Sequence, residues 1–127
     1  MTGVDTGFFF SLREQNPVAL KILEEEDIVI SVLTRLELHR LSLRRGIEWD
    51  EFGTLLAHSA AVVELDAGAA DEAVAISHGC GIPALDALIL ASLVRTGCRT
   101  IYTRDEHFLK FARKGVEIIR LQPSPAA

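Results

Sequence analysis

Apolar and polar positions follow two different periodicities along this chain. Short apolar runs rich in β-branched residues predict extended segments, at residues 2–6, 28–31, 61–65, 99–103 and 116–121. Longer segments with apolar residues at helical spacing predict helices, at residues 7–15, 17–26, 33–45, 48–59, 66–77, 82–94 and 105–114. Strands that alternate with helices indicate an α/β protein with a mainly parallel five-stranded sheet and helices on both faces. We therefore expect a three-layer α/β/α sandwich.

Residues that favour helix ends support this division of the chain. Pro17 opens the second helix, because a proline is tolerated in the first helical turn. Ser31 is a suitable N-cap for the helix that follows it, and Gly46 is a suitable residue to end that helix. Residues 78–81, with the sequence HGCG, are expected to form a loop.

The length of the chain indicates one domain. A chain of 127 residues can bury a single substantial core, and we expect one domain over residues 1–121 and a frayed tail at 122–127. No uninterrupted apolar run reaches the roughly 18 residues that suggest a membrane span, and the N-terminus has no basic segment followed by an apolar one. We therefore expect a cytoplasmic protein that does not bind membranes.

The charge and the cysteines argue against two classes of protein. A formal net charge of -5 and a pI near 5.3 disfavour a protein that coats nucleic acid by bulk positive charge. They are compatible with a nuclease that binds a divalent metal, because clustered carboxylates themselves make the net charge negative. Cys80 and Cys98 form no C-x-x-C pair and have no histidine at zinc-finger spacing, so we expect reduced thiols and no zinc finger.

Four acidic residues are predicted to lie at one edge of the sheet. Asp5 ends the first extended segment, and Asp105 comes two residues after the fourth. Glu37 lies in the second turn of the helix that follows the second strand. Asp86 lies in the first turn of a helix that leads into the fourth strand from the opposite edge. In a parallel sheet all four positions therefore converge on the edge formed by the carboxyl ends of the strands.

A shared position for four carboxylates predicts a metal site. A lone acid such as Asp86 on an apolar helix is costly unless its charge is compensated. Four carboxylates in one cleft cannot all stay ionised without cations, and oxygen ligands suit Mg²⁺ or Mn²⁺. Each acid also has an individual structural explanation, such as helix capping, the helix dipole, or pairing of Glu37 with Arg40 or Arg44. The common location favours ligation of metal by the four acids, directly or through water.

Four blocks of sequence surround these acids. They read VDTGFFF at the N-terminus, ISVLTRLEL around Glu37, IPALDALILASLV around Asp86 and YTRDEHF around Asp105. In this order and spacing they resemble the signature blocks of PIN-domain proteins, and the resemblance spans essentially the whole chain. It implies that the four acids match the acidic quartet of the family, that Thr103 matches the Ser or Thr that supports it, and that Thr6 matches the residue after the first Asp.

The resemblance also implies a fold and an activity. PIN domains have a five-stranded sheet between helices, and many are Mg²⁺- or Mn²⁺-dependent ribonucleases. Single-domain members from bacteria and archaea are mostly toxins of type II toxin-antitoxin pairs, the VapC-like group. The resemblance therefore implies a metal-dependent endoribonuclease that leaves a 5′-phosphate and a 3′-hydroxyl, with Mg²⁺ or Mn²⁺ as cofactor, RNA as substrate, an antitoxin as candidate partner, and a homodimer as the common assembly.

Three arginines supply positive charge near the expected site. Arg40 and Arg44 share the helix face of Glu37 and could either guide RNA phosphates or only solvate the helix. Arg104 stands where many family members have a small or polar residue, and it could bind a substrate phosphate or pair with an acid and weaken metal binding. The four histidines show no ligand spacing, and we interpret His107 as a surface residue.

Two other classes of function fit part of the pattern. A non-catalytic PIN-like module that binds RNA or protein would keep the fold and hold no metal, and the presence of all four acids argues against it. A phosphatase or phosphoacceptor domain also has an acid after its first strand. The phosphatase generally needs a second Asp where Gly7 stands, and the phosphoacceptor needs paired acids there and a late lysine, which the sequence lacks.

Overall fold

Five strands and seven helical segments make up the described part of the chain. The computed structural model describes residues 1–122, without the side chains of His58 and Ser59. In chain order the elements are β1 (Thr2–Val4), α1 (Thr6–Arg13), α2 (Pro17–Glu25), β2 (Ile28–Ser31), α3 (Val32–Arg45), α4 (Trp49–Ser59), β3 (Ala60–Val63), α5 (Ala67–Cys80), α6 (Ala84–Arg95), β4 (Thr100–Thr103), the 3-10 helix η1 (Glu106–Lys110) and β5 (Glu117–Arg120). The predicted α/β organisation is confirmed.

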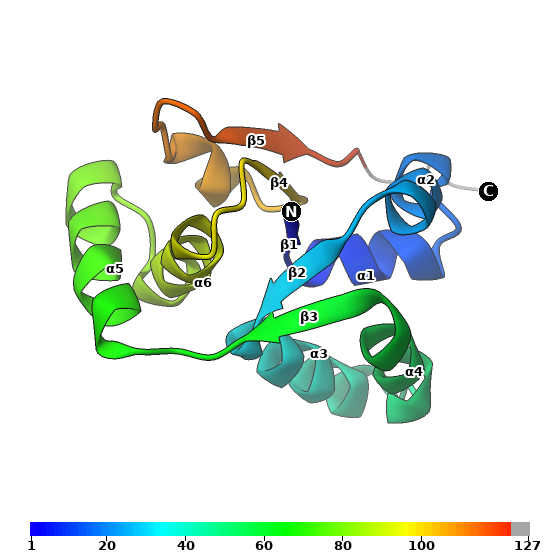
Figure 1. The fold of residues 1–127 in the computed structure, drawn as a ribbon. Helices are drawn as coiled ribbons and strands as arrows, with labels where there is room; N and C mark the ends of the chain where they lie inside the picture. The colour runs from blue at the N-terminus through cyan, green and yellow to red at the C-terminus, as the bar shows by residue number, and fades with distance from the viewer. Residues whose placement is uncertain (123–127) are drawn as a thin grey trace.

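The strands form one sheet in which every neighbouring pair is parallel. The order across the sheet is β3-β2-β1-β4-β5. The chain builds outward from β1 to β2 and β3, and then returns to place β4 on the other side of β1 (Figure 1). The direction of winding thus reverses between β1 and β4. In parallel sheets, a crevice for ligands opens at such a reversal, beyond the carboxyl ends of the two strands.

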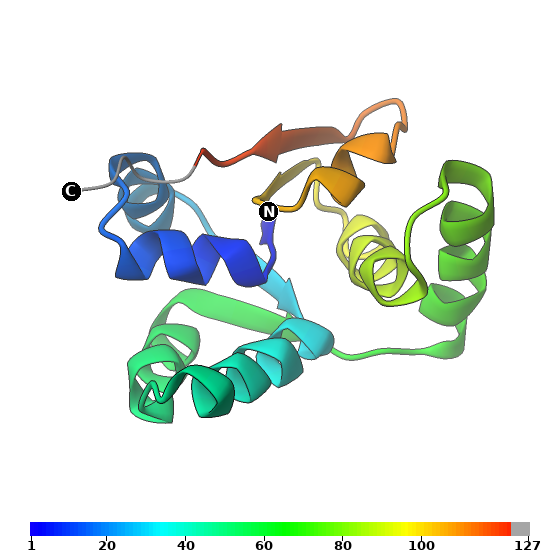
Figure 2. The same cartoon turned by 180° about the vertical axis from the view of Figure 1, so that it is seen from behind.

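Helices cover both faces of this sheet, as the sequence predicted. Helices α1 to α4 lie on one side, and α5, α6 and η1 lie on the other (Figures 1 and 2). Side chains alternate along β2 to serve the two layers, because Ile28 and Ile30 belong to the core beneath α1 to α4, whereas Val29 belongs to the core beneath α5 and α6. The molecule is a three-layer α/β/α sandwich.

Helix α6 packs closely against the central strand. Its buried residues are Ala87, Ile89, Leu90, Ala91, Ser92 and Leu93. Gly3 of β1 permits this approach, because a Cβ atom at that position would lie 3.0 Å from Cδ1 of Leu93. The close contact fixes the position of α6, and therefore of its first turn, relative to β1.

The expected ends of α3 are confirmed. The Ser31 hydroxyl oxygen accepts a hydrogen bond from the N–H of Leu33 at 3.1 Å and so caps the helix. Gly46 ends it in the left-handed conformation, with φ of 67°, which a glycine adopts without steric cost. Glu37 therefore occupies the second turn of α3, as the sequence indicated.

Two segments differ from the predicted structure. Residues 78–80 are the last turn of α5 and not a loop, because the helix ends only at Gly81, whose φ of 68° suits a C-cap. Residues 105–114 do not form a full helix. Only the short 3-10 helix η1 forms there, and the chain turns at Gly115 (φ of 87°) before β5.

Two further expectations concern the C-terminal tail and membrane spans. The sequence predicts the tail at residues 122–127, of which residues 123–127 lie outside the described part of the chain. Among the helices of residues 1–122, none combines the length and the apolar character needed to cross a bilayer.

Candidate metal centre

The structure brings the four predicted acids together in one cleft. Asp5, Glu37, Asp86 and Asp105 all line a cleft of about 250 Å³. Asp5 follows β1 and Asp105 follows β4, so the cleft lies at the reversal of winding in the sheet. Glu37 comes from α3 and Asp86 from the first turn of α6. The winding of the sheet thus unites side chains that are far apart in sequence.

Asp5 is buried and held in one orientation. Only 5% of its surface is exposed. Oδ1 accepts a hydrogen bond from the N–H of Gly7 at 3.0 Å, which also caps the start of α1. Oδ2 accepts a hydrogen bond from the Thr103 hydroxyl at 2.5 Å. Each oxygen of this carboxylate therefore has a donor.

Thr103 connects the acids that follow β1 and β4. Its side chain is fully buried at the end of β4. The hydroxyl donates to Asp5 and its oxygen accepts a hydrogen bond from the N–H of Asp105 at 2.9 Å. One hydroxyl group thus sets the spacing of two acids, which supports the role that the family resemblance implied for Thr103.

Thr6 orients the acid on α3. Its hydroxyl donates a hydrogen bond to Oε1 of Glu37 at 3.0 Å. Because Thr6 is the first residue of α1, this bond joins the first turn of α1 to the second turn of α3. Glu37 is therefore held by a partner that belongs to the cleft itself.

Asp86 and Asp105 form a tight group with His107. The imidazole Nδ1 lies 3.4 Å from Oδ1 of Asp105 and 3.7 Å from Oδ2 of Asp86. One ligand atom from each of the three side chains lies within 4.8 Å of the other two. His107 lies at the surface as the sequence indicated, with 45% of its side chain exposed, but the 3-10 turn after Asp105 also brings its ring to the cleft, which the sequence did not predict.

Burial makes the ionised form of Asp5 unfavourable. Desolvation raises the pKa of this carboxyl group from 3.8 to about 7. The hydrogen bonds from Thr103 and Gly7 favour the charged form and oppose this rise, while the charges of Asp105 and Glu37 add to it. A cation in the cleft would favour the ionised form and so oppose this rise.

Asp86 has the same kind of environment. Burial raises the pKa of its carboxyl group, and the charges of Asp105 and Glu37 raise it further. The ring of His107 opposes that rise. Asp86, like Asp5, therefore ionises more readily when a positive charge lies in the cleft.

The chemistry of the donors fits a divalent cation. Several carboxylates share one cleft, and two of them ionise with difficulty unless their charge is compensated. Carboxylate oxygens are the ligands that Mg²⁺ and Mn²⁺ prefer. Asp86, Asp105 and His107 could hold an ion directly, and Asp5 and Glu37 line the same cleft.

Comparison with known families agrees with the site and the fold. A model of the PIN domain matches residues 4–114, a range that contains all four acids. The chain belongs to the PIN-domain family. PIN domains are generally nucleases, which makes a nuclease the general class for this site. No curated protein sequence matches the chain.

Several solved structures share this fold. A toxin-antitoxin complex from Klebsiella pneumoniae superposes with a TM-score of 0.74 at 21% identity, over 91% of this chain and 95% of that one. VapBC2 from Rickettsia felis, bound to a DNA fragment from its promoter, superposes with a TM-score of 0.73 at 12% identity, over 94% of this chain and 97% of that one. FitAcB from Neisseria gonorrhoeae superposes with a TM-score of 0.65 at 26% identity, over 94% of this chain and 96% of that one.

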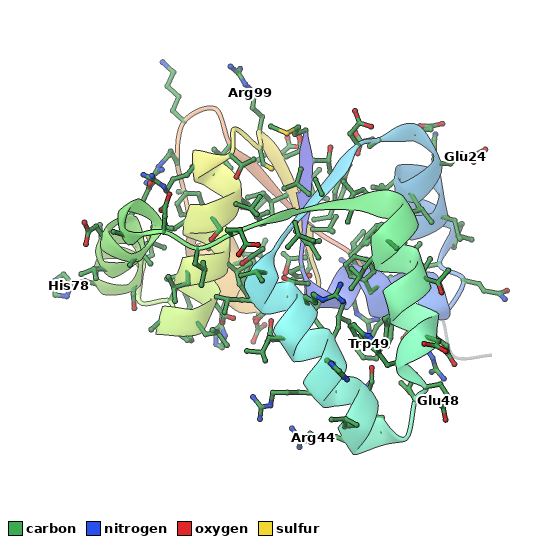
Figure 3. The ribbon with its side chains drawn as sticks, turned by 60° about the horizontal axis from the view of Figure 1, so that its bottom comes forward. Glu24, Arg44, Glu48, Trp49, His78 and Arg99 are labelled. Atoms are coloured by element: carbon green, nitrogen blue, oxygen red, sulfur yellow. The ribbon has the colours of Figure 1, made fainter. Side chains whose placement is uncertain are left out.

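Four arginines of this PIN domain line two small hollows around the cleft. Arg40 and Arg44 line a hollow of about 140 Å³ that also contains Glu37. Arg45 and Arg104 line a hollow of about 240 Å³. Figure 3 shows Arg44 extending outward from α3, at the opposite end of the molecule from Arg99.

Arg104 lies flat on the start of α1. A Cβ atom at Gly7 would lie 2.7 Å from Cβ of Arg104, so the glycine provides room for the arginine stem. The guanidinium pairs with Glu14 at 3.0 Å, and not with one of the four acids. Arg45 places its guanidinium carbon 4.7 Å from the ring centre of Phe10 in the same hollow. The place of Arg45 could not be predicted from the sequence, because it depends on the packing of α1 against α3.

A larger hollow lies elsewhere and does not belong to the site. It measures about 780 Å³ and is lined by residues that include Glu24, Glu26 and Asp27. These residues precede β2, at the amino edge of the sheet, where a parallel sheet does not place its ligand site. The convergence of acids, and not the volume of the hollow, identifies the candidate centre.

Proposed function

We propose that this PIN domain is a Mg²⁺- or Mn²⁺-dependent endoribonuclease that acts in the cytoplasm as the toxin of a toxin-antitoxin pair. The observation that carries the proposal is the convergence of Asp5, Glu37, Asp86 and Asp105 on one cleft at the reversal of winding. Membership in the PIN-domain family supports it.

The four acids are the proposed ligands, directly or through water. A divalent ion, when bound, neutralises charge on the phosphodiester and makes a coordinated water more acidic. Thr103 holds Asp5 and sets its spacing from Asp105, while Thr6 orients Glu37. These two hydroxyl groups position the ligands before any substrate arrives, which limits the reorganisation that the reaction requires.

The arginines are the proposed contacts to the RNA backbone. Arg40 and Arg44 lie in a hollow that includes Glu37, and Arg104 lines the cleft of the acids themselves. We add Arg45, which shares a hollow with Arg104. Because a guanidinium binds phosphate with two parallel hydrogen bonds, these residues would align the chain of phosphates on either side of the cleft.

A protein partner and a second copy complete the proposal. Three solved structures with this fold are described as a toxin-antitoxin complex, VapBC2 on promoter DNA, and FitAcB. By analogy we propose a cognate antitoxin and a homodimer for this chain. Growth arrest on expression of the wild type, relieved by a protein encoded beside it and absent with Asp86→Asn, would support the antitoxin.

Cleavage of RNA tests the activity. The purified protein is incubated with a mixed, structured RNA pool in Mn²⁺, in Mn²⁺ with excess EDTA, and as Asp86→Asn in Mn²⁺. We expect cleavage by the wild type in Mn²⁺ and a loss of at least about a hundredfold in the other two cases, because a ligand or the ion is missing. Asp71→Asn, which removes an exposed acid on α5, is the matched control and should cleave like the wild type.

Two outcomes would contradict the proposal. Equal cleavage by folded Asp86→Asn would place the activity at another site or in a contaminant. A wild type that cleaves no RNA and gains no thermal stability from millimolar Mn²⁺ would instead favour a non-catalytic module, because a ligand that binds the native state stabilises it by mass action.

A further inference from the structure

We infer that His107 is a nitrogen ligand of the metal centre and makes this nuclease favour Mn²⁺ and other transition metals over Mg²⁺. The inference rests on the proposed metal site and goes beyond its four acids. It assigns a role to an imidazole that the proposed mechanism does not use.

The distances between the three side chains leave room for a shared ion. Nδ1 of His107 lies 3.4 Å from Oδ1 of Asp105 and 3.7 Å from Oδ2 of Asp86. Ligand atoms that bind one ion at about 2.1 Å lie about 3 Å apart when adjacent and about 4 Å apart when opposite. The ligand atoms of Asp86, Asp105 and His107 lie within 4.8 Å of one another, which leaves room for an ion between them.

The backbone and a buried neighbour hold the ring at this place. The N–H of His107 donates a hydrogen bond to Oδ1 of Asp105 at 2.9 Å, which closes the first turn of η1. The next residue, Phe108, is 1% exposed and anchors η1 in the core beneath α6. The His107 side chain itself is 45% exposed, so it contributes little to that core. The position of the ring is thus set by its neighbours, and the fold does not depend on the ring itself.

A nitrogen donor changes which ion the cleft prefers. Mg²⁺ binds oxygen ligands and gains little from an imidazole, whereas affinity for imidazole rises from Mn²⁺ to Co²⁺ and Ni²⁺. If the ring served only as a positive partner of Asp86 and Asp105, it would compete with every cation, and its removal would strengthen the binding of all of them. Removal of the ring should therefore weaken metal binding if His107 is a ligand and strengthen it if His107 is only a positive partner of the acids.

Metal binding measured in solution tests the inference. The wild type, His107→Phe, His107→Gln and Asp86→Asn are titrated with Mn²⁺, Co²⁺ and Mg²⁺, and nitrogen coupling to bound Mn²⁺ is recorded by pulsed electron paramagnetic resonance. His78→Phe is the matched control, because His78 is exposed on α5 and points away from the molecule (Figure 3). We expect the Kd for Mn²⁺ and Co²⁺ to rise about tenfold or more in both His107 variants, and the Kd for Mg²⁺ to change less than about threefold. The nitrogen coupling should be present in the wild type and the control and absent from both variants.

Two kinds of result would overturn the inference: the first refutes only the role of His107, and the second also refutes the metal site. Bound Mn²⁺ without nitrogen coupling in the wild type, or tighter binding of all three ions by the His107 variants, would refute the ligand role. If Asp86→Asn still lost the metal, the proposed nuclease site would survive. A wild type that binds none of the ions, or an Asp86→Asn that binds them equally well, would refute the metal site and the role of His107 together.

Discussion

At the scale of single residues, the site depends on donors that hold buried charge. Asp5 is enclosed at the end of β1 and its two oxygens accept from Gly7 and Thr103. These hydrogen bonds do not cancel the cost of burial, which raises the pKa of Asp5 to about 7. Without metal, this residue therefore makes the folded protein sensitive to pH.

The sign of this sensitivity follows from the direction of the shift. Between about pH 4 and pH 7 the folded protein keeps a proton on Asp5 that the unfolded chain has lost, so the free energy of unfolding falls as the pH rises through this window. The contribution of Asp5 can reach about 4 kcal/mol. Urea denaturation in EDTA at pH 5 and pH 8 should show a smaller difference in Asp5→Asn than in the wild type. An equal difference in both proteins would assign the titration to another group, and Asp71→Asn should retain the wild-type difference.

At the scale of the elements, α6 positions the site through its apolar face. Leu90 is fully buried in the core that α6 shares with the sheet and α5, and Gly3 lets the helix approach β1. In the first turn of the same helix, Ala87 still belongs to the core, while Asp86 lines the cleft and Leu85 is exposed. One helix thus serves as core along its length and as site at its beginning.

The core role of α6 leads to a prediction about stability. Leu90→Ala should lower the free energy of unfolding by about 2–5 kcal/mol, because it removes buried methyl groups and leaves a cavity. Leu85→Ala on the same helix is the comparison, and its effect should stay within about 0.5 kcal/mol because this side chain is 40% exposed. Urea denaturation measures both values, and similar losses in the two variants would contradict the burial that the structure assigns to them.

At the scale of the whole molecule, an acidic chain places several cationic side chains beside its acidic cleft. The chain carries a formal net charge of -5, yet three arginines of α3 and Arg104 line two hollows beside the cleft. RNA phosphates would therefore be attracted locally by a protein that is acidic overall. Such binding weakens with salt, because each phosphate that a cationic side chain neutralises releases counterions from the RNA.

The salt dependence of RNA binding tests this arrangement. In Asp86→Asn with EDTA, where RNA stays intact, adding Arg104→Gln or Arg45→Gln should reduce the slope of log affinity against log salt by about 0.7 for each arginine that neutralises a phosphate in the parent protein. Arg99→Gln is the matched control, because Arg99 lies at the opposite end of the molecule from Arg44 (Figure 3). Equal slopes in all of these proteins would show that Arg104 and Arg45 do not neutralise RNA phosphates.

The sequence by itself determined the order of the elements, their kind except at residues 78–80 and 105–114, and the four acids that the cleft brings together. Apolar periodicity identified strands and helices, because a chain with one buried face repeats its apolar residues every two or every 3.6 positions. Residues such as Ser31 and Gly46 marked helix ends through local chemistry alone. Parallel strands then required Asp5 and Asp105 to lie at the same edge of the sheet.

Only the tertiary structure decided which neighbours these residues have. Apolar periodicity carries no information on how far a turn folds back. The position of His107 next to Asp86 and Asp105 could therefore not be predicted from residue spacing. The same holds for Arg45, which reaches its hollow through the packing of α3 against α1. The raised pKa of Asp5 also depends on burial from several elements at once. Local sequence sets local conformation, whereas distances between residues far apart in sequence exist only after the layers have packed.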